Sequence, residues 1–256
     1  MRYLKGTVSI SDKDDLPILR TVHRAGHLTN RQLFEYLHPS PWLASRWDSF
    51  RWRVRRLAEH GLIDRQHMIG LGDVLCLGEN GEILLQGREP IIVERNSRSR
   101  TANGRSQQWH DCDLFGIQLA LRRAGVVQFW EHETEVRAKN DFSTLRYVKD
   151  YDAVVTFRDG TNEATVALEY ERTAKSSREY GRICDEINRE KCVGMFLYLT
   201  ASLQLHNFLL HALRKTYRSL CIGIASEFCG DPQGAVLIDV RTGTGRRFKQ
   251  FFDGSL

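Results

Sequence analysis

Apolar residues recur every three or four positions in three stretches near the start of the chain, a spacing that predicts three helices. These stretches cover residues 15–26, 28–37 and 45–63. Gly26 is expected to end the first, and Thr29 or Asn30 to cap the second. Residues 63–78 then read as two short strands around two glycines, Gly70 and Gly72. The first third of the chain is therefore predicted to be three helices and a hairpin.

The second half alternates between strand-like and helix-like patterns. A helix is expected over 109–125, and three strands, joined as a meander, over 129–138, 151–157 and 163–171. A further helix, strand, helix and two strands are expected at 176–190, 192–200, 202–220, 221–228 and 234–240. This order predicts the α/β (α+β) class, with a mixed sheet between helices.

The third predicted helix has two unlike faces. Its apolar stripe consists of Trp47, Phe50, Val54 and Leu57. The opposite face carries residue types that contact phosphates and base edges, namely Ser49, Trp52, Arg53, Arg55 and Arg56. Three helices and a hairpin are the winged helix-turn-helix arrangement, which places its third helix in the major groove of double-stranded DNA. A basic face exposed only to solvent is the alternative.

The hairpin could add Arg65, beside Gln66 and His67, to the flanking DNA backbone. Residues 94–108 are polar, rich in serine and arginine, and lack periodicity, which predicts a basic linker. Its Arg98 and Arg100 could follow phosphates, or serve only to keep the joint soluble. The predicted domains are therefore 1–93 (winged helix-turn-helix), 94–108 (linker) and 109–256.

Paired carboxylates mark the predicted strand at 163–171. Because side chains alternate along a strand, Glu169 and Glu171 project to the same face. Two carboxylates so close repel each other unless a metal ion, a basic residue or water compensates them. Asp152 opens the preceding strand, and Glu133 is predicted to lie on the same face of the first strand as Glu131. Such carboxylates could hold Mg²⁺ or Mn²⁺, whereas glutamates on an exposed edge strand would need no metal.

Composition narrows the classes of protein. The chain has 256 residues and a formal net charge of +5, a mild excess that is compatible with phosphate-bearing partners. Its six cysteines show no CxxC spacing, so reduced thiols are expected. The first residues lack the apolar core of a leader peptide, and no apolar run is long enough to span a membrane. A cytoplasmic protein without membrane contact is expected.

The order of elements in the second half resembles the core of the PD-(D/E)xK nucleases, with Asp152 and Glu169 where their acidic residues stand. The lysine of that motif would be residue 171, which here is Glu171; Lys175 follows four positions later. Some restriction enzymes of this fold carry glutamate at that position. If the site is active, Asp152 and Glu169 would hold the metal, Glu171 would position or deprotonate water, and Lys175 would stabilise charge on the phosphate.

The chain as a whole is similar to the replication-relaxation family. The resemblance covers roughly residues 14–200, and "WHDCDL", "YDAVV" and "ALEYERTAKSSREYGRI" carry it, with Thr173 among the matching positions. It implies a DNA-binding regulator or accessory factor of a plasmid, conjugative element or phage. A metal-dependent endonuclease is one alternative. The other is an adaptor in a relaxosome or transposition complex, which docks its partner through Leu203, Phe208, Leu209 and Leu213. A homodimer would suit two-fold DNA sites.

Overall fold

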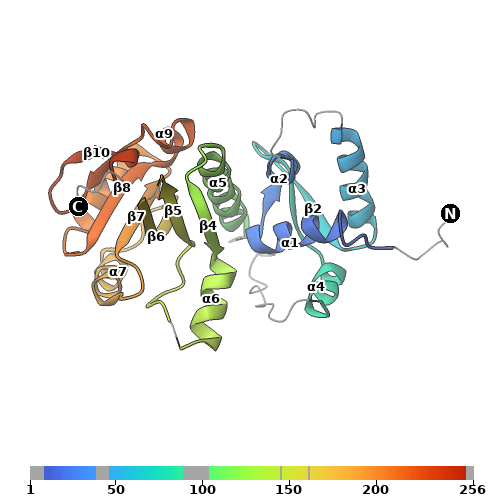
Figure 1. The fold of residues 1–256 in the computed structure, drawn as a ribbon, viewed down its shortest axis with the longest axis horizontal. Helices are drawn as coiled ribbons and strands as arrows, with labels where there is room; N and C mark the ends of the chain where they lie inside the picture. Colours follow the sequence, from blue (N-terminus) through green and yellow to red (C-terminus); the bar gives the residue numbers. More distant parts are fainter. Residues whose placement is uncertain (1–8, 39–45, 89–103, 145, 161, 252–256) are drawn as a thin grey trace. The chain divides into compact units, whose positions relative to one another are not determined.

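The structure is a computed structural model that describes residues 9–38, 46–88, 104–144, 146–160 and 162–251. The chain divides into two compact units, Met1–Phe115 and Gly116–Leu256 (Figure 1). The predicted linker at 94–108 lies largely outside the described residues, as do Arg98 and Arg100. Its last five residues are helical, because the helix expected from residue 109 already begins at Gly104.

The first unit contains helices around a small antiparallel sheet of strand order β1-β3-β2. Its elements are α1 (Asp15–Ala25), β1 (Leu28–Thr29), α2 (Asn30–Leu37), α3 (Trp47–Glu59), β2 (Ile63–Met68), β3 (Gly72–Leu77), α4 (Glu79–Gln86) and the first part of α5 (Gly104–Arg123). The three predicted helices and the hairpin are confirmed. Strand β1 and helix α4 are additional elements that the hydrophobic pattern did not reveal.

Local signals explain where these helices begin and end. Gly26 follows α1 with a φ of 76°, a conformation that glycine adopts without strain. Thr29 caps α2: its hydroxyl accepts a hydrogen bond from the Gln32 backbone, and the Gln32 side chain accepts one from the Thr29 backbone. The predicted apolar stripe of α3 is buried at Phe50, Val54 and Leu57. Trp47 is only half-buried and packs against Phe50.

The second unit is built on a mixed sheet, seven-stranded over the described ranges, of order β10-β9-β8-β7-β6-β5-β4. Its elements are β4 (Val127–His132), α6 (Glu133–Phe142), β5 (Ala153–Asp159), β6 (Asn162–Glu171), α7 (Ser177–Arg189), β7 (Met195–Thr200), α8 (Leu203–Ala212), β8 (Ser219–Ile224), α9 (Ala225–Gly230), β9 (Val236–Asp239), β10 (Gly245–Arg247) and the 3₁₀ helix η3 (Phe248–Phe251). Strands β4, β5 and β6 form the expected antiparallel meander. Strands β6, β7 and β8 run parallel to one another.

Three predicted elements of this unit were wrong in extent. The strand expected over 129–138 ends at His132, and α6 follows, because the Glu135 carboxylate accepts a hydrogen bond from the His132 backbone and caps the helix start. The strand expected over 221–228 ends at Ile224, where α9 begins. The helix expected over 202–220 is shorter and ends at Ala212.

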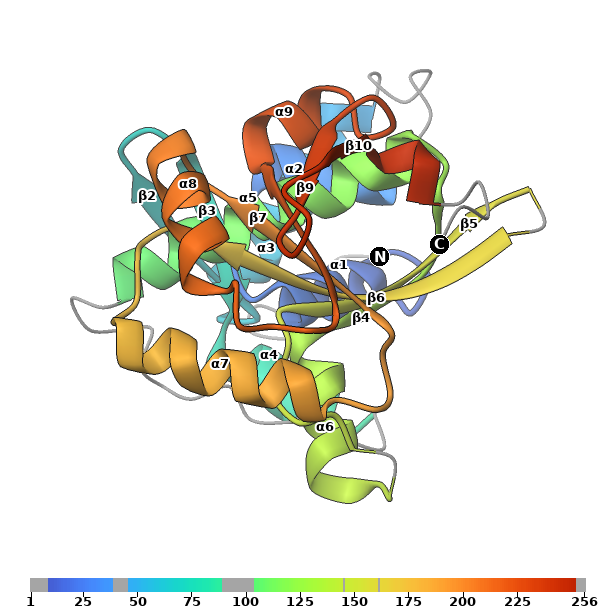
Figure 2. The ribbon, with the colours of Figure 1, turned by 90° about the vertical axis from the view of Figure 1, so that its left-hand side faces the viewer.

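Helices cover both faces of this sheet (Figure 2). Residues of α7 and α8, such as Ile187 and Leu209, share one buried cluster with Phe196 and Tyr198 of β7. On the other face, Phe157 of β5 stacks edge-on against Phe248, which in turn contacts Phe228 of α9. Figure 2 accordingly shows α7 below the sheet and α9 above it. Within the described ranges, no helix combines the length and the apolar character that crossing a membrane requires.

Candidate functional site

The solvent-facing side of α3 is basic and aromatic at its centre. Arg51, Trp52 and Arg55 are exposed, with 59% of Trp52 accessible to solvent. Asp48 and Glu59 are also exposed and lie one turn beyond this centre on either side. Neither Arg51 nor Arg55 forms an ion pair with any described residue. The helix thus presents two arginines and an indole ring to whatever binds there.

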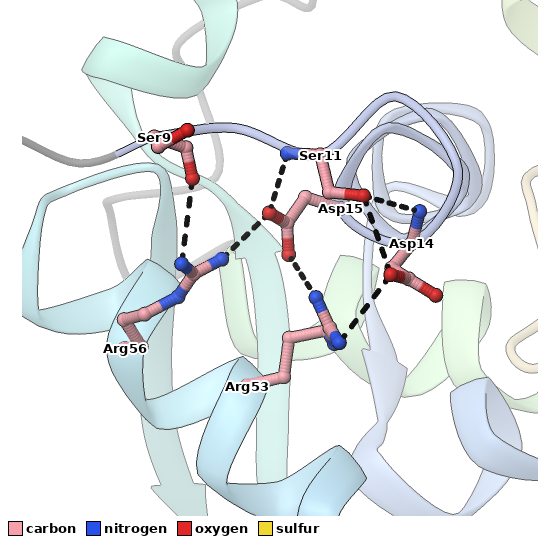
Figure 3. A network of polar contacts seen from close by, with 6 residues as sticks. All are labelled: Ser9, Ser11, Asp14, Asp15, Arg53 and Arg56. Atoms are coloured by element: carbon pink, nitrogen blue, oxygen red, sulfur yellow. Dashed lines mark hydrogen bonds and ion pairs between the residues drawn. The ribbon is translucent and has the colours of Figure 1, made fainter. Parts of the chain in front are cut away.

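Two other arginines of α3 are bound within the first unit (Figure 3). Arg53 Nη1 lies 3.1 Å from Asp15 Oδ1, and Arg56 Nη2 lies 2.6 Å from Asp15 Oδ2. The Ser11 backbone N–H also donates to this carboxylate, at 2.8 Å. Burial alone would raise the pKa of Asp15, but the hydrogen bonds from Ser11, Arg56 and Arg53 outweigh it and hold that pKa below its usual value. The network therefore joins α3 to the first turn of α1.

The five residues predicted on α3 consequently fall into two groups. Ser49, Trp52 and Arg55 are exposed, whereas Arg53 and Arg56 are partly buried by their pairing with Asp15. The prediction placed all three arginines on the polar face of the helix, but it did not include the ion pairs that Arg53 and Arg56 form with Asp15. The helix period put them on the polar side, but it could not show that Asp15, 38 residues before Arg53, would reach them. Arg51 was overlooked, although its spacing from Arg55 places it on the same face.

The hairpin of the first unit exposes the polar residues predicted there. Arg65, Gln66 and His67 of β2 are all accessible to solvent. Asp73 of β3 lies beside two of them: its carboxylate is 3.8 Å from Arg65 Nε and 3.2 Å from His67 Nδ1. Because this pairing is at the surface, it holds the side chains weakly and leaves them available to a stronger anion.

A row of polar side chains in the second unit starts at Asp152, just before β5, and crosses β6 and β7. Strand pairing sets Ala153 opposite Leu168, so Asp152 lies opposite Glu169, and the Tyr170 backbone N–H donates 2.7 Å to the Asp152 carboxylate. Glu169 is in turn paired with Tyr198 of β7. Strand β6 lies between β5 and β7, and both Glu169 and Glu171 are 4% exposed. The alternative of exposed glutamates on an edge strand is therefore wrong.

Each buried glutamate on this face has its own lysine. Lys149, which precedes β5, places its Nζ 2.7 Å from Glu169 Oε1. Lys175 is hydrogen-bonded to Glu171 after the end of β6, and Lys139 of α6 is bonded to Glu131 of β4. The ion pairs, listed in strand order, are Glu131–Lys139, Glu169–Lys149 and Glu171–Lys175. Lysine side chains thus neutralise the two neighbouring glutamates, Glu169 and Glu171.

The electrostatics of Glu169 reflect both burial and neighbours. Burial has the largest effect on the pKa of Glu169 and raises it, and the nearby negative charge of Asp152 acts in the same direction. Together they outweigh the attraction of Lys149, so the pKa of Glu169 is raised to about 7. Burial acts on Lys149 in the opposite sense, yet Glu169, Asp152 and Glu186 together raise its pKa. Lys149 is therefore an ammonium ion at neutral pH, held next to a carboxyl group that titrates there.

The residues predicted to bind a metal do not fit that purpose as they stand. Asp152 and Glu169 are brought together, but Glu169 is occupied by the Lys149 ammonium. Glu133, predicted to lie on a strand, is instead the first residue of α6 and pairs with Arg137. Throughout the described ranges, no group of three or more histidine, cysteine, aspartate or glutamate residues is arranged to hold a metal ion.

Sequence reasoning missed two members of this cluster, Lys149 and Tyr198. Lys149 is 20 residues before Glu169 in an irregular segment, and no periodic pattern pointed to it. Tyr198 occupies a strand that reads as uniformly apolar, so its hydroxyl attracted no notice. That hydroxyl is buried, and no described residue forms a hydrogen bond with it.

The apolar residues proposed as a partner-docking patch on the second unit are divided by the structure. Leu209 and Leu213 are fully buried, in the cluster beneath α7 and α8. Leu203 and Phe208 are exposed, at 59% and 39%. Phe208 also stacks edge-on against Tyr180 of α7. Burial against the sheet therefore accounts for half of the four residues.

Comparison with known proteins gives little further information. No protein-family model matches the chain, and no curated protein matches its sequence. One similar solved structure is that of the restriction endonuclease FokI bound to DNA, with 12% sequence identity and a TM-score of 0.27. That match covers 87% of this chain, which spans 45% of the FokI chain.

Proposed function

We propose that this chain is a DNA-binding protein whose first unit is a winged helix-turn-helix domain. In that arrangement α3 enters the major groove of double-stranded DNA and the β2–β3 hairpin follows the flanking backbone. The observation that carries the proposal is the exposed centre of α3, where Arg51, Trp52 and Arg55 are presented together. Arginine donates to phosphates and to guanine edges, and an indole ring contacts bases or sugars.

The function that follows is that of a regulator or accessory factor of replication, mobilisation or transcription on a plasmid, conjugative element or phage. This role is supported by the motifs at residues 109–114, 151–155 and 167–183, which resemble those of the replication-relaxation family. The second unit, a mixed sheet covered by helices that we take to be a PD-(D/E)xK-like domain, then serves contact with DNA or with a protein of a relaxosome or replication complex. Its lysine-paired carboxylates favour contact over hydrolysis. Two-fold DNA sites would be bound by a homodimer.

The test is a fluorescence-anisotropy titration of labelled duplex DNA over a series of salt concentrations. Arg55→Ala should weaken binding and lower the slope of log affinity against log salt by about 1, because one phosphate contact releases about one counterion. Arg158→Ala is the matched control, since Arg158 is an exposed arginine of β5 paired with Glu163. An Arg55→Ala protein with the wild-type slope would exclude this face of α3 as the contact.

A metal-dependent DNA endonuclease is the second candidate. The observation in its favour is that Asp152, the residue before β5, lies opposite Glu169 of β6, with Glu171 and Lys175 nearby. Mg²⁺ or Mn²⁺ would be its cofactor. The test is to incubate supercoiled DNA with the protein and either ion. An EDTA control and the Glu169→Gln variant are run beside it. Metal-dependent nicking that is lost in Glu169→Gln would establish the nuclease; intact DNA under every condition would exclude it.

A further inference from the structure

The environment of Lys149 shows how the carboxylate cluster is neutralised. Its side chain is 17% exposed, and its Nζ lies 2.7 Å from Glu169 Oε1. The same ammonium lies 5.5 Å from the centre of the Tyr151 ring, a distance at which a cation is attracted to the π-face. Two separate contacts thus hold this ammonium beside Glu169.

The polar row beside Lys149 forms a built site rather than a surface cluster of acids. Asp152, just before β5, lies next to Glu169 of β6, which is paired with Tyr198 of β7, and Glu169 and Tyr198 are buried. Tyr198 has a buried hydroxyl without a hydrogen-bond partner in the described structure, and the charges of Glu169, Glu171 and Asp152 act on it. A buried hydroxyl without a partner is costly, and beside the carboxylates it would offer a further oxygen to a cation that entered the cluster.

A divalent cation at this position would need the carboxylate oxygens of Asp152 and Glu169. The ammonium of Lys149 already contacts a Glu169 oxygen, and the two positive charges would repel each other strongly so far from water. We propose that the Lys149 ammonium is the resident cation of this site, in place of a divalent metal ion, and that removing it converts the cluster into a site for Mn²⁺. The proposal does not depend on DNA binding by the first unit, and it runs against the endonuclease alternative.

Calorimetric titration with Mn²⁺ tests this on the full chain. Wild-type protein should bind Mn²⁺ at this site too weakly to be seen at stoichiometric concentrations, whereas Lys149→Met should bind it about tenfold or more tightly than wild type, at an affinity that the titration measures. The double variant Lys149→Met/Glu169→Gln should lose that binding. Lys139→Met is the matched control: it removes the lysine from another glutamate on the same face of the sheet, Glu131, and should gain no Mn²⁺ affinity.

Thermal unfolding provides a second measurement that does not depend on the heat of binding. Mn²⁺ should raise the melting temperature of Lys149→Met and leave that of the wild type unchanged. Lys149→Gln serves as a second variant that can still hydrogen-bond Glu169 and so preserves the fold more closely. Mn²⁺ binding by wild-type protein that is lost in Glu169→Gln would overturn the proposal, even if no Lys149 variant folds. Folded Lys149 variants that gain no Mn²⁺ affinity would overturn it equally.

Discussion

Arg56 of α3 donates a hydrogen bond of 2.6 Å to the fully buried carboxylate of Asp15 in α1. Arg53 holds the other oxygen of the same carboxylate at 3.1 Å. The two arginines therefore fix the packing of α3 on α1, and they do so at the expense of their availability to DNA. Arg55, one position before Arg56, has no such partner among the described residues. Together with Arg51 and Trp52, it forms the DNA contact proposed for α3.

Asp15→Asn should destabilise the first unit markedly. It leaves two partly buried guanidinium groups without their counter-charge, and breaking a buried ion pair from one side costs about 3–5 kcal/mol. Chemical denaturation followed by circular dichroism measures the loss. Asp14→Asn is the matched control, since Asp14 is half exposed and pairs with Arg53 at 3.5 Å; its cost should be about 1 kcal/mol or less. Equal costs for the two variants would contradict the assignment of Asp15 as the centre of the network.

Acid should weaken the same network. The pKa of Asp15 is lowered in the folded chain, so its carboxylate contributes stability that is fully present above the pKa of an unfolded aspartate, about 3.9. That contribution is lost as the pH falls through the folded pKa. The stability difference between wild type and Asp15→Asn should therefore shrink below about pH 4. A difference that stays constant down to acidic pH would argue that Asp15 acts through packing rather than charge.

Neighbouring arginines of α3 should respond oppositely to alanine substitution. Arg56→Ala should lower the free energy of unfolding by about 3 kcal/mol, because it leaves the buried Asp15 carboxylate with one fewer partner. Arg55→Ala should change stability by about 0.5 kcal/mol or less, as is usual for an exposed site, while it weakens DNA binding. Denaturation and anisotropy on the same two proteins provide the comparison. The reverse pattern would show that Arg56 faces DNA and that the network with Asp15 is dispensable.

The carboxyl of Glu169 should make stability depend on pH in the sense opposite to Asp15. Its pKa rises from the ordinary 4.5 to about 7 in the folded chain, so the folded state retains a proton that the unfolded state has lost. Between these values the stability of wild type should fall with rising pH, relative to Glu169→Gln, by up to about 3 kcal/mol. The same substitution at exposed Glu163 controls for the loss of a charge. Parallel wild-type and Glu169→Gln curves would refute the raised pKa.

Gly81 of α4 should not tolerate a side chain. A Cβ at this position would lie 2.2 Å from the Leu62 carbonyl oxygen and 2.8 Å from Leu77 Cδ1, closer than packed atoms can approach. Gly81→Ala should therefore destabilise the first unit by about 1–3 kcal/mol, since overpacking forces the backbone to shift. Gly87→Ala, whose Cβ would meet only ordinary contacts at 3.7 Å, is the control. Thermal melting of both variants would reveal a wrong assignment if Gly81→Ala proved the more stable.

Periodicity was sufficient for the elements whose buried face is continuous. The helices α1, α2, α3 and α7 and the strands β5, β6 and β7 lie where the apolar spacing places them, because burial of one face selects one period. It failed at residues 133–138, where the alternation of Glu133 and Glu135 imitates a strand. There the hydrogen bond from the His132 backbone N–H to the Glu135 carboxylate caps and stabilises a helix instead. Caps depend on local hydrogen bonds, which hydrophobic periodicity does not register.

The sequence alone determined that Glu169 and Glu171 share a face and that Asp152 lies at the start of the neighbouring strand, where the structure places it one residue before β5, because strand alternation and element order depend on local geometry. It also placed the arginines of α3 on the polar side of one helix. Only the tertiary structure decided what compensates these charges: Lys149 for Glu169 and Asp15 for two of the arginines. Ion pairs of this kind join residues far apart along the chain, so they exist only once packing has brought the elements together and excluded water.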